Sequence, residues 1–462
     1  MSVYRIPATK DSTLISQSLF ANAGQSEILL IGTRRRFEDI GTNADTGSIC
    51  RAVIKFGETP ISTSFAEITN LINNEYISSS ECVTASLKIF HAYSDDYAST
   101  YNFEINPLSQ QWDEGDGFDL EPTEISGDSG SCCWTQSDSS TYWTLPGGAT
   151  QSDYLAQVTH STGDEDIEVD ITTTVKAWVD GTFANYGLLV KANNEEVTTG
   201  SRFKRVYSRN TNTPYEPVIE VKWDDRIRDD RVGILNNTSD NKLYLYYKQR
   251  GQLIDIPGIT KGNDTLYVKI TQTTTSSAAI ITDLSASWKR KGIYETDAIN
   301  ISGSTTSSVY DHWYSGSTLL SSGTCSVATS SMNTYLSPIY DYFVITIPNL
   351  QEEYDKGDVK NIEVFARDRY PTYTYSTSSI IEQQTQTLYN ASFSISDYET
   401  DERLIDYSKF TAISYNSDMN WFRFFFTGLP LNRPLYFSIK YEKDGTERYE
   451  KYLKTFVIRN KE

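Results

Sequence analysis

Long hydrophobic runs are missing from this sequence. No window of the 462 residues approaches the roughly 18 apolar residues needed to span a membrane. The opening residues also lack the apolar core of a classical signal peptide. We therefore expect a chain made in the cytoplasm without such a signal and with no membrane partner.

Cysteine is scarce and poorly spaced for metal binding. The five cysteines, Cys50, Cys82, Cys132, Cys133 and Cys325, include no C-x-x-C pair. Only three histidines accompany them, so no zinc-type spacing exists. We interpret all five as reduced or buried thiols, with a disulfide as the lesser alternative.

Basic residues are outnumbered. The chain has 41 Lys and Arg against 61 Asp and Glu, a net charge of −20. A nucleic-acid binder normally carries a basic stripe, and the segment "RIRDDR" (226–231) is neutralised by its own aspartates. We expect no direct nucleic-acid partner, and partner proteins with basic patches instead.

A recognisable catalytic constellation is also missing. His91, His160 and His312 are the only candidate histidine bases. None lies in a motif that supplies a nucleophile, a base and an oxyanion-stabilising group together. The sequence predicts a protein that is not an enzyme.

Aromatic and β-branched residues are plentiful, and the chain has 32 Tyr and 19 Phe. These residues favour strands, and the length suits two or three domains, so we expect an all-β protein. In the first half, alternating patterns predict strands at residues 27–32, 50–56, 86–91, 101–105, 167–170, 187–191 and 217–223.

One short stretch has a different period. In "DITTTVKAWVDGTFANYGLLVKA" (170–192), Ile171, Val175, Trp178 and Val179 recur at helical spacing, with Gly181 as a stop. It predicts one small helix covering an open end of a β-sandwich. The first domain, 1–225, is therefore expected to be a sandwich or jelly roll with one short helix.

Two further sandwiches are predicted beyond a charge-dense bridge at residues 223–237. Residues 232–350 begin with a hairpin around "KQRGQ" and end with "YDYFVITIP" (340–348) as a closing strand. Residues 351–462 contain the hairpin turn "KDGTE" (443–447). Each segment has the size and alternation of an immunoglobulin-like unit.

The first domain resembles the DNRLRE-type domain, a jelly roll related to carbohydrate-binding modules. The resemblance is carried by an ordered series of motifs, each weak alone. In order they are "KDSTLISQSLFANAGQSEILLIG" (10–32), "CRAVIKF" (50–56), "ASLKIFHA" (85–92), "WDEGDG" (112–117), "SGSCCWTQ" (129–136), "WTLPGGA" (143–149), the helical stretch at 170–192 and "PYEPVIEVKW" (214–223). The loops at 113–121 and 138–141 are longer and more acidic than the family pattern.

This resemblance implies a role in recognition or assembly. Family members occur in secreted and surface proteins, where sugar binding is proposed, and in virion proteins of tailed phages. The tandem immunoglobulin-like units are similar in layout to those virion proteins. The implied location is the virion, assembled in the host cytoplasm, with other virion proteins as partners and a homo-oligomer within a symmetric assembly.

Three sets of residues are candidate sites. Oxygen ligands in the acidic loop suit one structural calcium ion, and we name Asp113, Asp116, Asp119 and Glu121. Aromatic rings in the same loop are a candidate glycan platform, with core packing as the alternative: Trp112, Trp134 and Trp143. An apolar strand is either central to a sandwich or a subunit contact through Trp421, Phe422, Phe424 and Phe426.

Two functional hypotheses follow. The first is a non-enzymatic structural component of a tailed-bacteriophage virion, in the neck, tail or baseplate, that docks other subunits through rigid β modules. The alternative is a carbohydrate-binding adhesin that recognises host surface glycans through the loop from Trp112 to Trp143.

Overall fold

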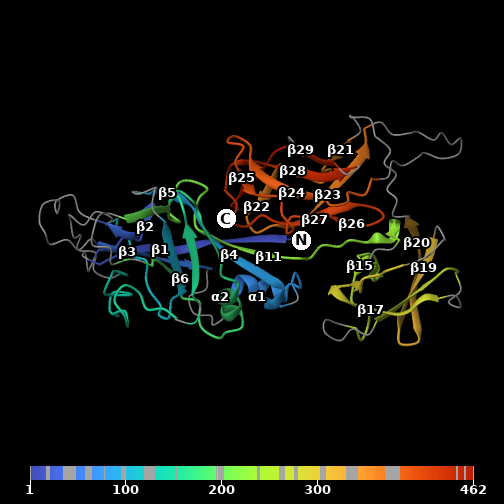
Figure 1. The fold of residues 1–462 in the computed structure, drawn as a ribbon, viewed down its shortest axis with the longest axis horizontal. Coiled ribbons are helices and arrows are strands. Elements are labelled where there is room, and N and C mark those ends of the chain that lie inside the picture. The colour runs from blue at the N-terminus through green and yellow to red at the C-terminus, as the bar shows by residue number, and fades with distance from the viewer. Residues whose placement is uncertain are drawn as a thin grey trace, which may run out of the picture.

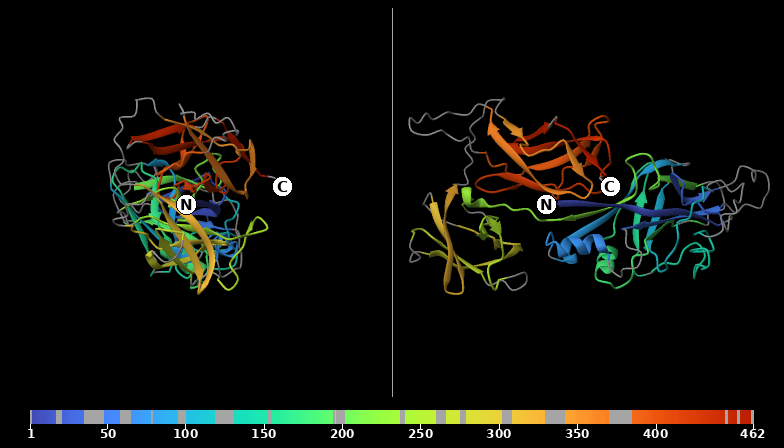
Figure 2. Two further views of the ribbon diagram at one scale, coloured as in Figure 1. Left: turned by 90° about the vertical axis from the view of Figure 1, so that its right-hand side faces the viewer. Right: turned by 180° about the vertical axis from the view of Figure 1, so that it is seen from behind.

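Three β-sandwiches make up the part of the chain that the structure describes (Figure 1). This computed structural model describes residues 2–16, 21–34, 48–57, 65–77, 79–94, 100–118, 131–151, 153, 155–193, 195, 202–236, 240–259, 266–274, 279–301, 308–328, 342–369, 385–443, 446–451 and 454–460. The N-terminal and middle sandwiches lie at opposite ends, and the C-terminal sandwich lies alongside the junction between them (Figures 1 and 2). The predicted all-β class is confirmed.

The N-terminal sandwich is organised around one long strand, β1 (Ser2–Ile15). Its first half pairs with β11, and after a register shift near Ala8 its second half pairs with β3. One sheet contains, beside β1, the strands β11 (Val218–Trp223), β4 (Val83–Ile89) and β8 (Ile167–Asp170). The other contains β5 (His91–Ser94), β10 (Arg202–Tyr207), β2 (Ile28–Arg34), β3 (Ser48–Phe56), β9 (Leu188–Ala192), β6 (Tyr101–Pro107) and β7 (Ala156–His160).

Two short helices cover one end of this sandwich, in the residues that the structure describes (Figure 1). The predicted helix is α2 (Thr172–Val179), which buries Val175 and Trp178. The other, α1 (Ala66–Asn73), was not predicted, although Ile68 and Leu71 recur at helical spacing and are buried. Neither described helix has the length and apolarity of a membrane span.

The middle sandwich begins after a 3-10 turn at Asp230–Val232. The predicted hairpin is β14 (Lys248–Gln249) and β15 (Gln252–Leu253), with positive φ at Arg250 and Gly251 as a tight two-residue turn requires. The remaining strands are β12 (Ile234–Leu235), β13 (Tyr244–Tyr246), β16 (Leu266–Thr271), β17 (Ala279–Arg290), β18 (Ile293–Thr296), β19 (Ser308–Ser315) and β20 (Thr318–Ala328).

The C-terminal sandwich begins earlier than the sequence indicated. The described part of "YDYFVITIP" forms β21 (Phe343–Thr346), which pairs with β23 (Val359–Asp368) instead of closing the middle unit. Residues Phe343 and Ile345 consequently lie in the C-terminal core. The other strands are β22 (Glu353–Asp355), β24 (Ser392–Asp397), β25 (Arg403–Ile405), β26 (Ser414–Tyr415), β27 (Asn420–Phe425), β28 (Pro434–Lys443), β29 (Thr446–Lys451) and β30 (Phe456–Arg459). The tip of the "KDGTE" turn, residues 444–445, lies outside the described residues.

Candidate functional site

The tryptophans of the long loop pack inward. Trp112 and Trp143 are 2% and 4% exposed, in a small core with Leu14 and Leu189. Their indole nitrogens donate to main-chain oxygens, Trp112 Nε1 to Tyr186 O at 2.8 Å and Trp143 Nε1 to Cys133 O at 2.9 Å. Neither ring has a face open to solvent. These two residues therefore pack in the core, which is the alternative to a glycan platform.

Trp134, the third predicted platform residue, is partly exposed, but its ring is already occupied. The Arg51 guanidinium carbon lies 4.9 Å from the ring centroid. Arg51 also forms an ion pair with Glu195 at 2.6 Å. Among the described residues of this loop, the large apolar side chains most exposed to solvent are Phe118, Tyr142 and Leu145, at 72%, 65% and 62%.

The predicted calcium cluster is not assembled in the described residues. Asp113 is exposed and pairs with Lys10 at 3.3 Å, and Asp116 is exposed. Asp119 and Glu121 lie outside the described residues. Within the described part of the chain, no group of three or more His, Cys, Asp or Glu side chains is arranged to hold a metal ion.

A carboxylate between the predicted ligands binds an arginine. Glu114 accepts two hydrogen bonds of 2.6 Å from Arg209, and a third of 2.8 Å from the Asp11 amide. Asp11 is fully buried and accepts from the Arg209 amide at 2.6 Å. Burial raises the pKa of the Asp11 carboxyl to about 7, against the opposing effect of Arg209.

A second acidic loop, residues 161–166, folds around a buried lysine. The Lys204 ammonium donates to Gly163 O at 3.1 Å and to Glu165 O, and lies 3.1 Å from His160 Nδ1. Burial lowers the pKa of Lys204 to about 8. The Glu165 carboxylate accepts hydrogen bonds from the amides of residues 161–163. The lysine therefore supplies the positive charge that orders this loop.

The four described cysteine side chains, Cys50, Cys132, Cys133 and Cys325, are buried, as predicted. Burial raises the pKa of the Cys132 thiol to about 12. The side chain of Cys82 lies outside the described set. These thiols are placed for packing, because a reactive cysteine needs exposure and a lowered pKa.

The apolar strand β27 has two faces with different neighbours. Phe422, Phe424 and Phe426 are at most 1% exposed and pack in the C-terminal core. The Phe422 ring stacks on Phe393 at a centroid distance of 4.0 Å. These three side chains are enclosed by their own sandwich, so the structure corrects their assignment as a subunit contact.

The opposite face of β27 contacts the other two sandwiches. Phe425 is 2% exposed and belongs to the core of the N-terminal sandwich. Its ring makes edge-to-face contacts with Tyr4, Tyr76 and Trp223, at centroid distances of 5.6, 5.4 and 5.3 Å. Trp421, the fourth predicted contact residue, packs instead against the linker and the middle sandwich. The partner of this face is the rest of the same chain.

Charged groups reinforce this contact between strand β27 and the other two sandwiches, which we call the seam. Arg423, between Trp421 and Phe425, lies 3.3 Å from the Asp225 carboxylate and 4.9 Å from the Tyr76 ring centroid. Although burial opposes ionisation, nearby cations including Arg423 hold the pKa of Asp225 at about 2. Asp225 also accepts a 3.0 Å hydrogen bond from Ser2 Oγ. The start of β1, the end of the first sandwich and β27 are thus joined.

The charge-dense bridge is ordered and partly buried. Its Ile227 amide donates to Ser414 Oγ at 3.1 Å, and its Asp229 amide to Tyr415 O at 3.2 Å. Asp230 is 4% exposed and accepts from Tyr415 Oη at 2.8 Å. The bridge pairs with β26 of the C-terminal sandwich, so it forms part of the seam between the sandwiches.

Comparisons with known proteins found similar solved structures only. No family model and no curated protein matches this chain. Among solved structures, Titin-A168169 is 10% identical over 51% of this chain and 96% of its own, with a TM-score of 0.17. The N-terminal eight Ig domains of Down Syndrome Cell Adhesion Molecule are 8% identical over 98% of this chain and 57% of theirs, with a TM-score of 0.14. A DUF4785 family protein from Legionella pneumophila is 9% identical over 99% and 89%, with a TM-score of 0.14.

Proposed function

We propose that this chain is a non-enzymatic structural component of a tailed-bacteriophage virion, a neck, tail or baseplate accessory that docks other subunits. The observation that carries the proposal is the seam made by β27, which places Phe425 in the core of another sandwich and Trp421 against the third. Modules joined in this way present their outer surfaces at fixed spacing, which suits a part that positions several partners. The resemblance of the first domain to the DNRLRE-type domain, together with a layout similar to that of virion proteins, supplies the setting.

Mass spectrometry of purified particles tests this role. The chain should be found at a fixed small stoichiometry relative to the capsid protein, in a multiple that fits a ring of the neck or tail. Gold-labelled antibody should then place it at one site on the particle. An abundant host protein measured in the same preparation controls for carry-over. A chain absent from particles, or present only at the level of that host protein, would contradict the proposal.

Recognition of host glycans is the second candidate function. It is favoured by Tyr142, whose exposed ring lies in the loop of the predicted platform. Glycan-array binding by the full chain that is lost in Tyr142→Ala would support it. Leu145→Ala, at a similarly exposed position of that loop, is the matched control. Binding that survives Tyr142→Ala would exclude this ring as the platform.

A further inference from the structure

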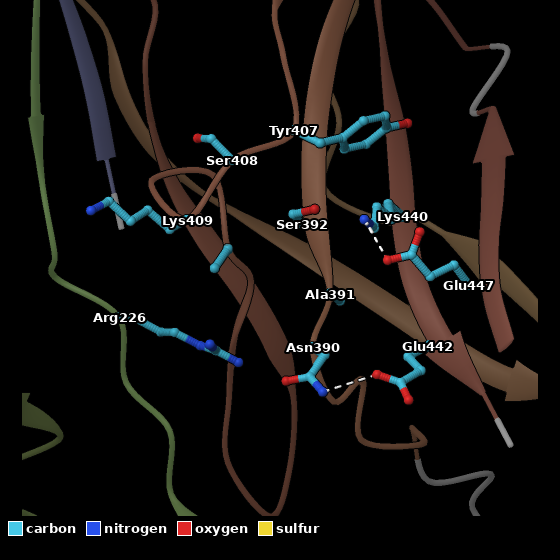
Figure 3. Close-up of a pocket in the computed structure, with 11 residues that line it drawn as sticks. Arg226, Asn390, Ala391, Ser392, Tyr407, Ser408, Lys409, Lys440, Glu442 and Glu447 are labelled. Carbon is cyan, nitrogen blue, oxygen red and sulfur yellow. Dashed lines mark hydrogen bonds and ion pairs between the residues drawn. The ribbon is translucent and has the colours of Figure 1, made fainter. Parts of the chain in front are cut away.

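A hollow of about 400 Å³ opens where the linker meets the C-terminal sandwich (Figure 3). Its walls come from Arg226 of the linker, the residues around the start of β24, the segment 407–412 and strand β28. This volume is in the range of small-ligand sites, about 300–1,000 Å³. The hollow is distinct from the tryptophan loop and from the apolar seam.

Arg226 contributes an unpaired positive charge. Its neighbour Ile227 is held by main-chain and side-chain hydrogen bonds to β26. The guanidinium carbon lies 5.9 Å from the Tyr415 ring centroid. Within the described residues, Arg226 Nε is buried without a hydrogen-bond partner. A guanidinium partly withdrawn from water and lacking an acceptor gains strongly from an incoming carboxylate.

The opposite wall offers mainly acceptors. Asn390 Nδ2 donates to the Glu442 carboxylate at 3.0 Å, and Lys440 pairs with Glu447 at 2.7 Å. In Figure 3, Arg226 extends toward Asn390, with Glu442 beyond it. Sugar hydroxyls can donate to the remaining acceptor positions of these carboxylates. Lys409, which also lines the hollow, adds a further cation near the ligand.

An aromatic ring completes the lining. Tyr407 lies at the edge of the hollow, 5.6 Å from the exposed Tyr449 ring in an edge-to-face contact. The Arg403 guanidinium carbon lies over the Tyr407 ring, 5.1 Å from its centroid, so the ring has one face left for a ligand. Aromatic side chains combine a broad apolar face with a polar tip. A pyranose ring has a C–H face that fits such a surface, while its hydroxyls reach polar groups around it.

We propose that this hollow binds a pyranose sugar with a single carboxylate, such as a uronic acid residue of an acidic polysaccharide. The carboxylate lies on Arg226, hydroxyl groups engage Asn390 and Glu442, and the sugar ring borders Tyr407 on the side away from Arg403. The site does not rest on the proposed virion role. The proposed sugar site is formed mainly by residues of the C-terminal sandwich.

The test uses the full chain and two matched probes, methyl glucuronide and methyl glucoside, which differ in the carboxylate. Saturation-transfer NMR titration should detect the glucuronide and not the glucoside. Arg226→Gln should weaken glucuronide binding about tenfold or more, because it removes a hydrogen bond between two charged groups. Asn390→Gly, which keeps the positive φ of 50° accessible, should also weaken it. Lys248→Gln removes a positive charge from the exposed strand β14 and should leave binding unchanged.

Several outcomes would overturn the proposal. These are no detectable glucuronide binding, equal binding of the two sugars, or unchanged binding in both Arg226→Gln and Asn390→Gly. Stronger binding of acetyl-diglutamyl amide would assign the hollow to an acidic protein segment instead. Melting curves of each variant separate a lost site from a lost fold, and Asn390→Gly keeps the test open if Arg226→Gln is unstable.

Discussion

Charged side chains withdrawn from water hold the loops of the N-terminal sandwich. Lys204 bonds two main-chain oxygens, and Arg209 binds both oxygens of Glu114. Removing one member of such a group leaves a buried charge or dipole without a partner, which costs several kcal/mol. Glu114 and the acidic loop at residues 161–166 therefore have structural roles that depend on an arginine and a lysine far away in the chain.

Asp11 should make stability depend on pH. Its carboxyl has a pKa of about 7 in the folded chain, raised by burial from its ordinary value of 3.8. The folded state then holds the proton more tightly than the unfolded state, so this contribution to the free energy of unfolding falls as the pH rises from about 4 to 7. The loss is on the order of a few kcal/mol.

Asp11→Asn should remove that decline. The amide oxygen can still accept from the Arg209 amide, and the side chain no longer ionises. Melting temperatures across this pH range should fall in the parent and stay flatter in the variant. Asp283→Asn, at an exposed position of β17, should follow the parent curve. Parallel curves for parent and Asp11→Asn would show that Asp11 does not titrate in this window.

The two faces of strand β27 serve different cores. Alternation places Phe422 and Phe424 on one side and Trp421 and Phe425 on the other, and both sides are buried. The inward face belongs to its own sandwich, while the outward face is covered by the N-terminal sandwich and the linker. A strand of this kind couples elements that otherwise fold around separate cores.

Gly428, two residues beyond Phe426, is a sensitive point of this coupling. A Cβ there would lie 2.5 Å from Arg5 Cβ and 2.6 Å from Arg5 O, and the residue has φ +70°. Gly428→Ala should therefore combine backbone strain of about 1–2 kcal/mol with a steric clash at the seam. Thermal melting should show a clear loss of stability.

Gly316→Ala separates the two effects. Gly316 has φ +57°, and an added Cβ would meet no atom within 4 Å. This variant carries the strain without the clash, so it should lose less stability than Gly428→Ala. Equal losses in the two variants would mean that the close approach to Arg5 is absent in solution.

Phe425 should control whether the N- and C-terminal sandwiches unfold together. Phe425→Ala removes the ring that β27 places in the N-terminal core, at a cost of about 3–5 kcal/mol. Calorimetry of the parent should show these two sandwiches melting in one transition, and the variant should separate it into two. Phe118→Ala, at a side chain that is 72% exposed, is the control. A single transition in the variant would indicate that other contacts maintain the coupling.

At the scale of the whole molecule, the linker seam determines where the middle sandwich lies. Trp421 packs with Ile227, Tyr244 and Ile293, which come from the linker and the middle sandwich. This cluster is small, and the bridge beside it pairs with β26 over only a few residues. The position of the middle sandwich should therefore be more sensitive to a single substitution than that of the other two.

Trp421→Ala should loosen this arrangement. X-ray scattering of the variant should give a larger radius of gyration than that of the parent, because the middle sandwich gains freedom to swing outward. Met419→Ala, at a 41% exposed side chain near the same strand, should leave the radius unchanged. An unchanged radius in Trp421→Ala would show that the linker alone holds the angle.

Much of the local structure was readable from the sequence. Alternation located strands such as β3 and β11, and the turn at Arg250 and Gly251 was recognisable. The period of the apolar residues predicts helix α2, and helix α1 has a similar spacing of apolar residues in a chain dominated by strands. These features depend on neighbours within a few residues.

What lies opposite a side chain was decided only by the tertiary structure. Periodicity assigns Phe425 to a face of its strand, but only the packing of distant segments shows that this face enters another sandwich. For the same reason Trp112 proved to be core and Asp230 part of a buried seam. The strands, the hairpin and the all-β class can be read from the sequence, because they follow from local spacing and backbone preference. The seam and the hollow beside Arg226 arise where segments about 200 residues apart meet, and local spacing carries no information about such encounters.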